Sequence, residues 1–357
     1  MCDLKVLGNS SSPHLRTWLR VLPYRFNLRV YDIHTGRPSI LENLRVPVVV
    51  PLPGVFRRVG KLFQYIFLGL WLRWFCRRDG LIHAHNASGY GLSALLSGQA
   101  YIITTYGSEV YGARRRGVIY RWILKKILSN ARLVTTSSDH MRRTLVRCYR
   151  LPPGRIFSKM LLDPRFLDGF AIDSRGQERT WFVNRRMTEL YCTISVVQAF
   201  KVFVDEGGVG RLVLLEGDAD RDYAARVRAE AEDCSNIEII RGFVDQKKLI
   251  EQLNRAHFAI SVPKTDQFSS SILEAAACGA IPVLRNLESY ERIKGVSIIL
   301  NDSLDFESSL ISMFKETSAL PYSDVEALSA DARSFVSDKF SHTDFLESYA
   351  DHIDEIA

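Results

Sequence analysis

The chain has 357 residues, of which 46% are hydrophobic and 24% charged, and its formal net charge is +7. This composition is typical of a globular protein and excludes a disordered chain, a collagen-like repeat and a small disulfide-stabilised scaffold. At roughly 100–200 residues per domain, the length indicates two domains.

Short apolar runs alternate with helix-length segments along the whole chain. In the first half we expect strands at 3–7, 28–33, 46–50, 81–83, 101–104 and 133–136. In the second half we expect strands at 181–183, 212–215, 237–240, 258–262, 281–284 and 297–300, with helices at 193–204, 223–232, 245–255 and 270–278 and in the tail at 324–356. This alternation predicts an α/β protein with two doubly wound, Rossmann-like parallel sheets and a cleft between the two domains.

Prolines and glycines interrupt this alternation at residues 151–179, where the charge also changes sign. Up to Arg165 the chain holds 27 Lys and Arg against 7 Asp and Glu, and the rest holds 20 against 33. We therefore predict a basic first domain at 1–165, a second domain at 166–330, and a helical tail at 331–357 that packs back on the first domain. The basic half indicates contact with an anionic surface, which could be nucleic acid or a membrane.

Two segments favour the membrane. Residues 54–78 contain an aromatic-rich apolar run between basic flanks, and residues 114–128 read as a basic helix with apolar positions at helical spacing. Neither is long enough to span a bilayer, which needs about 20 apolar residues, so we expect both to lie in the interface. The alternative is that each helix simply packs on its own domain.

The cysteines and the first residues indicate the cellular compartment in which the protein is expected. Six cysteines occur without any C-x-x-C pair, which argues against a zinc ribbon and fits a reducing compartment. The first residues show no charged segment followed by an apolar core, so we expect no signal peptide.

The most informative stretch is SVPKTDQFSSSILEAAACGAIPVL, at 261–284. A strand is followed by a polar loop carrying Asp266, and Ser269–Ser271 then open a helix as natural capping residues. The free N–H groups and dipole of this helix favour a phosphate. Glu274 lies one turn into the helix, placed to accept hydrogen bonds from ribose hydroxyls. Asp266 lies where a sugar could bind.

This stretch resembles the retaining glycosyltransferases of family 4, which have the GT-B fold. Their E-x7-E signature is followed by an alanine-rich helix and G-x-P-V, and here Asp266 replaces the first Glu. The resemblance implies that Asp266 binds hydroxyls of the donor sugar and that Glu274 binds the nucleotide ribose. It also implies that the backbone N–H groups of Phe268, Ser269, Ser270 and Ser271 bind the diphosphate.

A second match opens the C-terminal domain, TWFVNRRMTELYCTISVVQAF. Family members carry an Arg and, five residues later, a Lys, and both grip the diphosphate. The family shares the A-F pair that is Ala199 and Phe200 here. Counting back from this pair puts Arg186 at the Arg position and Tyr191 at the Lys position. Arg185 or Lys264 could replace the missing cation. The resemblance further places Gly217, Gly242 and Phe243 near the nucleotide base.

The first domain matches the family more loosely. LIHAHNASGYG resembles the family's strand-end H-x-H region, and TTYGSEVY resembles its H-G-[ST]-[DE] loop, with Tyr106 where His is common. Gly8 through His14 follow the first strand, as in the family's acceptor-side loop. The resemblance thus places Gly8, His14, His85 and Tyr106 on the acceptor side, with His85 grouped with Asp266, Glu274 and Arg186 as catalytic candidates.

The resemblance implies a retaining, hexosyl-type transferase that needs neither a metal ion nor a further cofactor. The two D-x-D sequences at 218–222 read as helix caps rather than as a metal site. The donor would be a UDP- or GDP-sugar. The basic, aromatic first domain favours a lipid or lipid-linked acceptor, as in polysaccharide, lipopolysaccharide or glycolipid synthesis, with the protein held peripherally at the cytoplasmic face of a membrane.

Three alternatives stay open. The first is an epimerase or phosphorylase of the same fold, which phosphate-dependent sugar release would reveal. The second is a nucleic-acid-binding protein that uses the basic half, although we expect no nucleic-acid partner. The third is a non-catalytic partner subunit, suggested by Tyr191 and Tyr106.

Overall fold

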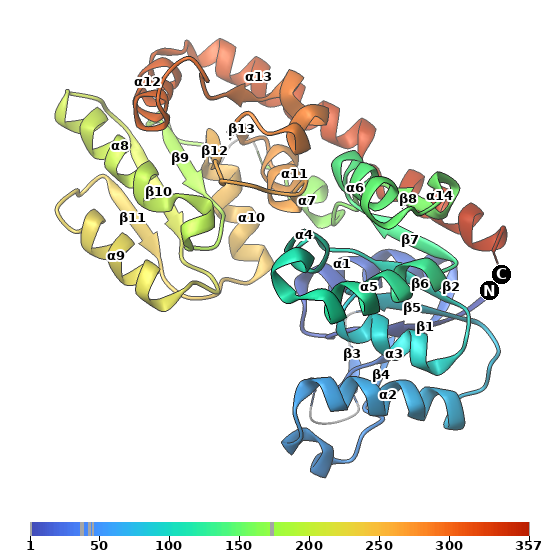
Figure 1. Ribbon diagram of the computed structural model, residues 1–357. Helices are drawn as coiled ribbons and strands as arrows, with labels where there is room; N and C mark the ends of the chain where they lie inside the picture. The colour runs from blue at the N-terminus through green and yellow to red at the C-terminus, as the bar shows by residue number, and fades with distance from the viewer. Residues whose placement is uncertain (1, 36–38, 42–43, 45, 172–174, 357) are drawn as a thin grey trace. The chain divides into compact units, whose positions relative to one another are not determined.

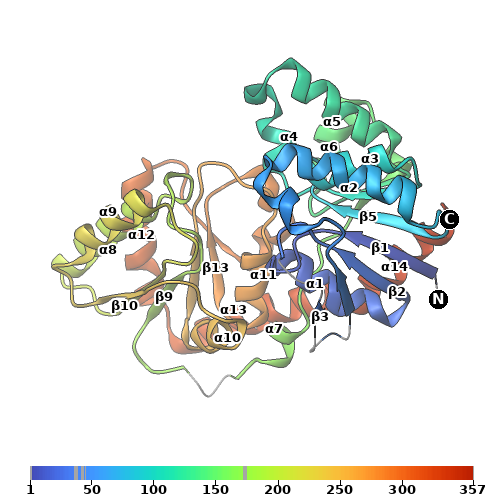
Figure 2. The same ribbon diagram turned by 90° about the horizontal axis from the view of Figure 1, so that it is seen from below.

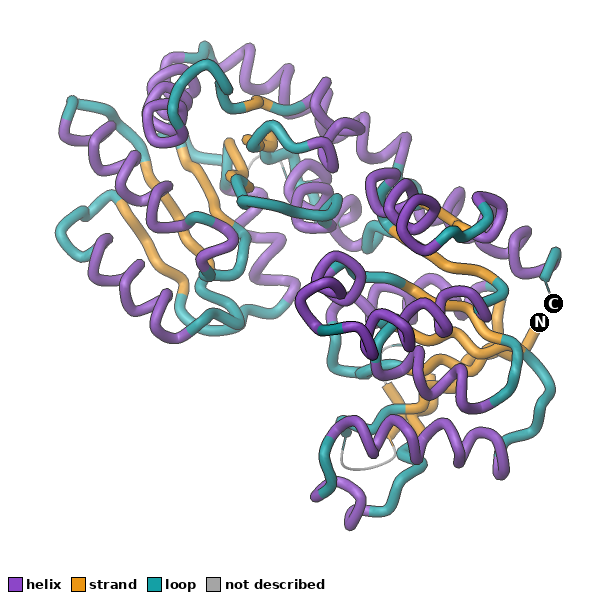
Figure 3. The backbone as a smooth tube through the Cα atoms, viewed as in Figure 1, coloured by secondary structure: helices purple, strands orange, loops and turns teal. Residues whose placement is uncertain are grey.

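The structure is a computed structural model that describes residues 2–35, 39–41, 44, 46–171 and 175–356. The chain divides into two compact units, of which the first comprises 1–161 with 342–357 and the second comprises 162–341. Each unit has its own parallel sheet with helices on both faces, as the orange strands and purple helices of Figure 3 show. The predicted fold class, two Rossmann-like domains of the GT-B type, is confirmed.

Unit 1 has a sheet of eight described strands in the order β3-β4-β2-β1-β5-β6-β7-β8, all parallel except β3, which is antiparallel to β4 (Figure 1). The strands are β1 (Cys2–Leu7), β2 (Phe26–Tyr31), β3 (Ser39–Leu41), β4 (Val46–Val49), β5 (Leu81–His85), β6 (Tyr101–Thr104), β7 (Leu133–Thr136) and β8 (Ile156–Ser158). The α-helices are α1 (Pro13–Val21), α2 (Lys61–Phe75), α3 (Gly89–Ser97), α4 (Ser108–Tyr111), α5 (Val118–Asn130), α6 (Asp139–Tyr149) and α14 (His342–Asp354).

The two faces of this sheet are covered by different helices. One apolar core joins the sheet to α2, α3, α5 and α6, and a second core joins the opposite face to α1 and α14. Figure 2 shows α2 and α1 on opposite sides of β1 and β2. In the second core the Oη of Tyr349 on α14 lies 2.9 Å from Nδ1 of His83 on β5. The C-terminal helix is therefore part of unit 1, although it follows unit 2 in the chain.

Unit 2 has a parallel sheet of six described strands in the order β11-β10-β9-β12-β13-β14. The strands are β9 (Thr180–Val183), β10 (Arg211–Leu215), β11 (Ile237–Ile240), β12 (Phe258–Ser261), β13 (Ile281–Leu284) and β14 (Ile298–Ile299). The α-helices are α7 (Arg165–Asp168), α8 (Thr193–Asp205), α9 (Arg221–Ala231), α10 (Gln246–Arg255), α11 (Ser270–Ala277), α12 (Phe306–Ala319) and α13 (Tyr322–Lys339). Its core centres on Trp181, which is fully buried among aromatic rings of α8, β12 and α12.

The strand order reverses once in each sheet, and such a switch point opens a crevice beyond the carboxyl ends of the central strands. In unit 1 it lies between β1 and β5, and in unit 2 between β9 and β12. The loops after these four strands are therefore the places where ligands are expected.

The strands expected from the sequence all occur, with ends shifted by at most two residues. Two further strands were missed, β3 and β8. We expected no strand within residues 151–179, whereas Ile156 and Phe157 are buried there and β8 extends the sheet beside β7. The sequence placed the domain boundary after residue 165 and the tail at 331, whereas the units divide after 161 and 341.

Candidate functional site

The first helix turn after β12 forms the centre of the candidate donor site in unit 2. The Ser269 side chain caps α11 by accepting a hydrogen bond from the Ser271 N–H at 3.3 Å, as the capping prediction required. The next strand, β13, is fully buried, and this holds α11 against the sheet edge. The N–H groups at the start of α11 thus face the switch-point crevice of unit 2, where a diphosphate would be stabilised.

Arg185, in the loop after β9, lies beside this helix start. Its guanidinium donates to the Ser271 Oγ at 2.6 Å, to the Ser269 Oγ, and to Oδ2 of Asp266 at 2.7 Å. The arginine side chain is only 6% exposed, and its guanidinium carbon lies 4.3 Å from the centre of the Tyr191 ring. Tyr191, at the position of the family's lysine, thus supplies an aromatic face for Arg185 instead of a second cation.

Asp266 is held from three directions. Besides Arg185, its Oδ2 accepts a hydrogen bond from the Tyr290 hydroxyl at 2.8 Å, and its Oδ1 accepts one from the Gln267 N–H at 2.9 Å. Burial raises the pKa of Asp266, and the Arg185 charge opposes this rise. The carboxylate is therefore fixed in place before any sugar binds.

Arg186 does not join this cluster. Its side chain is 57% exposed, and it donates through Nε to the Asp218 carbonyl at 2.6 Å, with Nη2 3.3 Å from the Asp218 carboxylate. The two arginines lie in a bend after β9 and make different contacts, Arg185 with α11 and Arg186 with Asp218. Arg185 is therefore the arginine that contacts the α11 N-terminus, and the role expected for Arg186 stays a prediction.

Glu274 lies four residues after Ser270 on α11. Burial raises its pKa to about 7, the nearby Asp163 carboxylate adds to the rise, and the Ser270 side chain and Arg185 oppose it. A carboxyl group whose pKa is strongly raised is a common feature of functional sites. Its expected role at the ribose is compatible with this position.

The remaining predicted donor residues occupy neighbouring loops of unit 2. The loops after β10 and β11 meet through a hydrogen bond from the Gly217 N–H to the Gly242 carbonyl at 3.1 Å, and Phe243 beside them is 76% exposed. Lys264 is exposed in the loop between β12 and α11, and its N–H donates to the Leu190 carbonyl at 2.9 Å. The Phe268 side chain is buried against Phe340, so only its backbone could face a ligand.

In unit 1 the predicted acceptor residues come together at the other switch point. The Tyr106 Oη lies 2.7 Å from Nδ1 of His85, and the His14 ring lies 5.3 Å from the Tyr106 ring. A Cβ at Gly8 would come within 2.6 Å of the Leu15 Cδ2 and 3.4 Å of the His85 Cβ, so a larger residue there would require the Leu15 side chain to shift. Burial lowers the pKa of His85 well below its usual value, which keeps the imidazole neutral.

Three buried polar residues of these sites were missed as site residues. Asp32 accepts hydrogen bonds from the Ser10 N–H and hydroxyl, both at 2.7 Å, and fixes the loop after β1. Glu109 accepts from the Tyr106 N–H at 2.7 Å. Tyr290 comes from the 3₁₀ segment Glu288–Val296, and no sequence motif marks it. Of the three residues, only Glu109 had a signal in the sequence, because it is the acidic residue of the Y-G-S-E loop.

The D-x-D sequences behave as helix caps. The Asp220 side chain accepts a hydrogen bond from the Tyr223 N–H at 3.0 Å at the start of α9. In the described part of the chain, no three His, Cys, Asp or Glu side chains are grouped so that they could hold a metal ion. Metal independence stays a prediction.

Comparisons with known proteins agree with this geometry. Residues 14–157 match the family model described as Glycosyltransferase Family 4. The predicted resemblance to this family is confirmed. No curated protein sequence matches the chain significantly.

Solved structures extend the agreement to the whole chain. A sucrose-phosphate synthase from Thermosynechococcus elongatus has a TM-score of 0.78 at 13% identity, with 99% of each chain covered. Anabaena HepE in complex with UDP and glucose has a TM-score of 0.75 at 12% identity, covering 99% of this chain and 100% of HepE. A glycosyltransferase from Rickettsia africae has a TM-score of 0.75 at 13% identity, covering 99% of this chain and 98% of its own. At these identities the likeness establishes the GT-B fold.

Proposed function

We propose that this GT-B protein is a retaining glycosyltransferase that moves a hexosyl group from a nucleoside diphosphate sugar to an acceptor. The observation that carries this proposal is the cluster of Arg185, Asp266 and the α11 N-terminus at the switch point of unit 2. A buried guanidinium beside the N-terminus of a helix is suited to a diphosphate. The HepE structures that hold UDP or UDP-glucose support a uridine donor.

The chemistry then needs little more than electrostatics. As the bond between the sugar C1 and the diphosphate oxygen breaks, Arg185 and the α11 N–H groups stabilise the charge that develops on the diphosphate. The acceptor oxygen forms the new bond to C1 on the same face, and its proton passes to a phosphate oxygen. Asp266 orients the sugar hydroxyls and Glu274 the ribose. No protein nucleophile and no metal ion are required.

The acceptor in this proposal is a lipid or a lipid-linked glycan, because unit 1 exposes apolar surface next to basic residues. On α2 the side chains of Phe63, Phe67, Leu70 and Trp74 recur at helical spacing, and each is at least 36% exposed. On α5, beyond α3 on the same face of the sheet, Val118, Ile119 and Trp122 are more than 60% exposed.

Such patches mark interaction surfaces, and basic flanks favour an anionic membrane. In the described residues no helix is both long and apolar enough to cross a bilayer. The exposed apolar patches and their basic flanks support our proposal that unit 1 binds peripherally at the cytoplasmic membrane face.

A transfer assay tests this proposal. The full chain is incubated in EDTA with radiolabelled UDP- or GDP-hexoses and bacterial lipid extract, and label entering the organic phase is counted. We expect transfer from one donor, reduced at least about tenfold by Asp266→Asn because a charged hydrogen-bond acceptor is lost, and unchanged by Arg211→Gln, an exposed arginine at the start of β10. Sugar release that depends on added phosphate, without transfer, would indicate a phosphorylase instead.

A further inference from the structure

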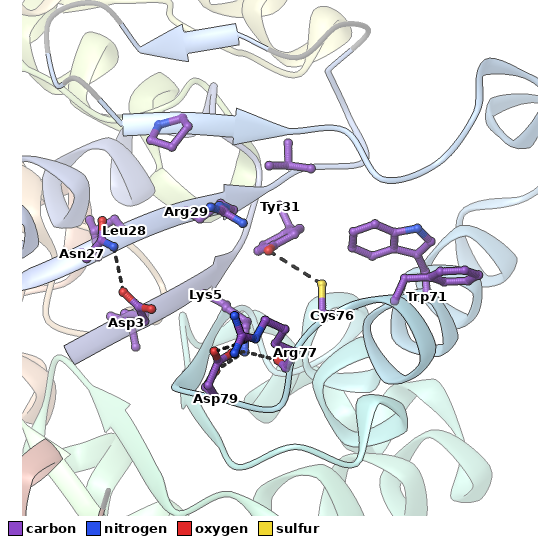
Figure 4. Close-up of a pocket in the computed structure, with 14 residues that line it drawn as sticks. Asp3, Lys5, Asn27, Leu28, Arg29, Tyr31, Trp71, Cys76, Arg77 and Asp79 are labelled. Atoms are coloured by element: carbon purple, nitrogen blue, oxygen red, sulfur yellow. Dashed lines mark hydrogen bonds and ion pairs between the residues drawn. The ribbon is translucent and has the colours of Figure 1, made fainter.

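A hollow of about 410 Å³ opens on the sheet of unit 1, on the face that carries α2. Its floor is formed by the first half of β1, by β2 and by part of β4, and its wall is the C-terminal end of α2 with the segment that follows (Figure 4). The predicted acceptor residues Gly8 and His85 lie at the carboxyl ends of β1 and β5, and neither lines this hollow.

The floor is polar where a buried sheet would be apolar. Strands covered on both faces normally read as continuous hydrophobic runs. Here Asp3 pairs in register with Asn27 and Lys5 with Arg29, while Leu4 and Leu28 between them are buried under the opposite face. Helix α2 therefore leaves this part of the sheet open to a polar ligand.

The wall of the hollow is positioned by Lys5. Its ammonium group donates to the Arg77 carbonyl at 2.7 Å, to the Gln99 Oε1 at 3.1 Å and to the Asp79 carbonyl. These bonds tie the segment after α2 to β1. The Arg77 side chain is left 91% exposed, with its Nε 3.3 Å from the Asp79 carboxylate, and Arg29 is exposed on the floor.

Aromatic rings close the other side. The rings of Trp71 and Tyr31 are 6.0 Å apart, and Trp71 stacks with Phe75 at 6.2 Å. Phe75 is 75% exposed, and the next residue back, Trp74, ends the exposed apolar stripe of α2. The hollow is therefore adjacent to the stripe of α2 that we propose to contact the membrane.

We propose that this hollow binds the phosphate headgroup of an anionic phospholipid. Arg29 and Arg77 donate to the phosphate oxygens, and Trp71 and Phe75 pack against the glycerol and the first acyl carbons. The proposal rests on the membrane contact proposed above for unit 1. It adds a defined lipid site to a surface otherwise held by non-specific attraction, and so fixes how α2 lies on the membrane.

The test uses dihexanoyl phosphatidylglycerol below its micelle concentration, titrated calorimetrically into the full chain. We expect one saturable site, weakened about tenfold or more in the double variant Arg29→Gln/Arg77→Gln, since each charged hydrogen bond contributes at least a fewfold to affinity. The matched control is Arg114→Gln/Arg115→Gln, which removes two exposed arginines of unit 1 outside the hollow and should leave this affinity unchanged.

Three results would overturn the assignment. Equal weakening by both double variants would mean non-specific attraction, and equally tight binding of inorganic phosphate would mean a free-phosphate site. Absence of any saturable site in the wild type would remove the hollow as a lipid site. UDP binding measured on the same samples separates this proposal from the transferase proposal, because the hollow variants should bind UDP as the wild type does.

Discussion

At the scale of single residues, the ion pair of Arg185 and Asp266 is costly to hold. The side chains are 6% and 13% exposed, and a buried ion pair seldom gains in attraction what it loses in desolvation. Tyr290, Ser269 and Ser271 offset part of this cost by hydrogen bonding to the same groups. Such an arrangement is best explained by ligand binding, for which charges must be fixed in advance.

Glu274 gives a prediction about stability and pH. Its folded pKa of about 7 exceeds the usual 4.5, so the folded protein binds the proton more tightly than the unfolded chain. The free energy of unfolding should therefore fall as pH rises from about 4.5 through 7, and the ionised group should cost on the order of 3 kcal/mol above pH 7. Glu274→Gln removes this cost, so it should raise the melting temperature at pH 8 and change it little at pH 5.

The measurement is thermal unfolding of wild type and Glu274→Gln from pH 5 to pH 8. The matched control is Glu238→Gln, on the surface of β11, where the carboxylate is 48% exposed and paired with Arg211. A difference between wild type and Glu274→Gln that is constant with pH would show that Glu274 titrates normally.

The sequence predicted part of this site for a physical reason. The eight-residue spacing of Asp266 and Glu274 spans a strand-end loop and a helix start, both of which depend on local sequence, and the structure places them there. Arg185 and Tyr290 reach Asp266 across 81 and 24 residues, and such contacts depend on how strands and loops pack. The choice between Arg185 and Arg186 depends on a side-chain direction that a count of residues does not give.

At the scale of elements, α2 depends on one close approach. Gly69 faces α3, and a Cβ there would lie 2.8 Å from the Ser93 carbonyl oxygen and 2.7 Å from the Leu96 Cβ. Both distances are shorter than a Cβ contact can be, and the Ser93 oxygen belongs to the backbone, so it cannot move aside as a side chain could. The two helices therefore pack at a distance that only glycine allows.

Gly69→Val should destabilise the protein by about 1–3 kcal/mol, because overpacking forces the helices apart. Leu70→Val, at the next and exposed position of α2, is the matched control and should cost less than about 1 kcal/mol. Urea unfolding followed by circular dichroism measures both. Equal costs for the two variants would mean that α2 and α3 tolerate separation.

The strands also differ in how well the sequence predicts them. The strands that were expected are mostly continuous apolar runs, as buried parallel strands require. β8 has three residues and follows Pro152 and Pro153, which are typical of a loop, and its pairing with β7 is what makes it a strand. β3 is also three residues long and is the antiparallel strand of its sheet.

At the scale of the whole molecule, the uneven charge of the two halves is compatible with the roles that we propose for the two units. The first 165 residues carry 27 basic and 7 acidic side chains, and the exposed apolar surfaces of α2 and α5 lie among them. The remaining residues are net acidic, so the donor site must concentrate positive charge locally, through Arg185 and the α11 N-terminus. The overall charge therefore indicated an anionic partner for the first half of the chain, nucleic acid or a membrane, and gave no sign of a nucleotide site in the second half.

The path of the chain was harder to predict than its fold class. Alternating strands and helices predicted two doubly wound sheets, because that pattern has few packed solutions. The place of α14 depends on contacts such as that of Tyr349 with His83, which are 266 residues apart. No local pattern carries that information.

The central claim is that unit 2 holds a nucleoside diphosphate sugar through Arg185. The most direct test is calorimetric binding of UDP, GDP and ADP in EDTA to the full wild-type chain and to Arg185→Gln, Arg186→Gln and Arg211→Gln. We predict that one nucleotide binds tightly, that Arg185→Gln weakens it about 10- to 100-fold, that Arg186→Gln weakens it less, and that Arg211→Gln leaves it unchanged. Failure of all three nucleotides to bind, or equal affinity of Arg185→Gln and wild type, would contradict the account.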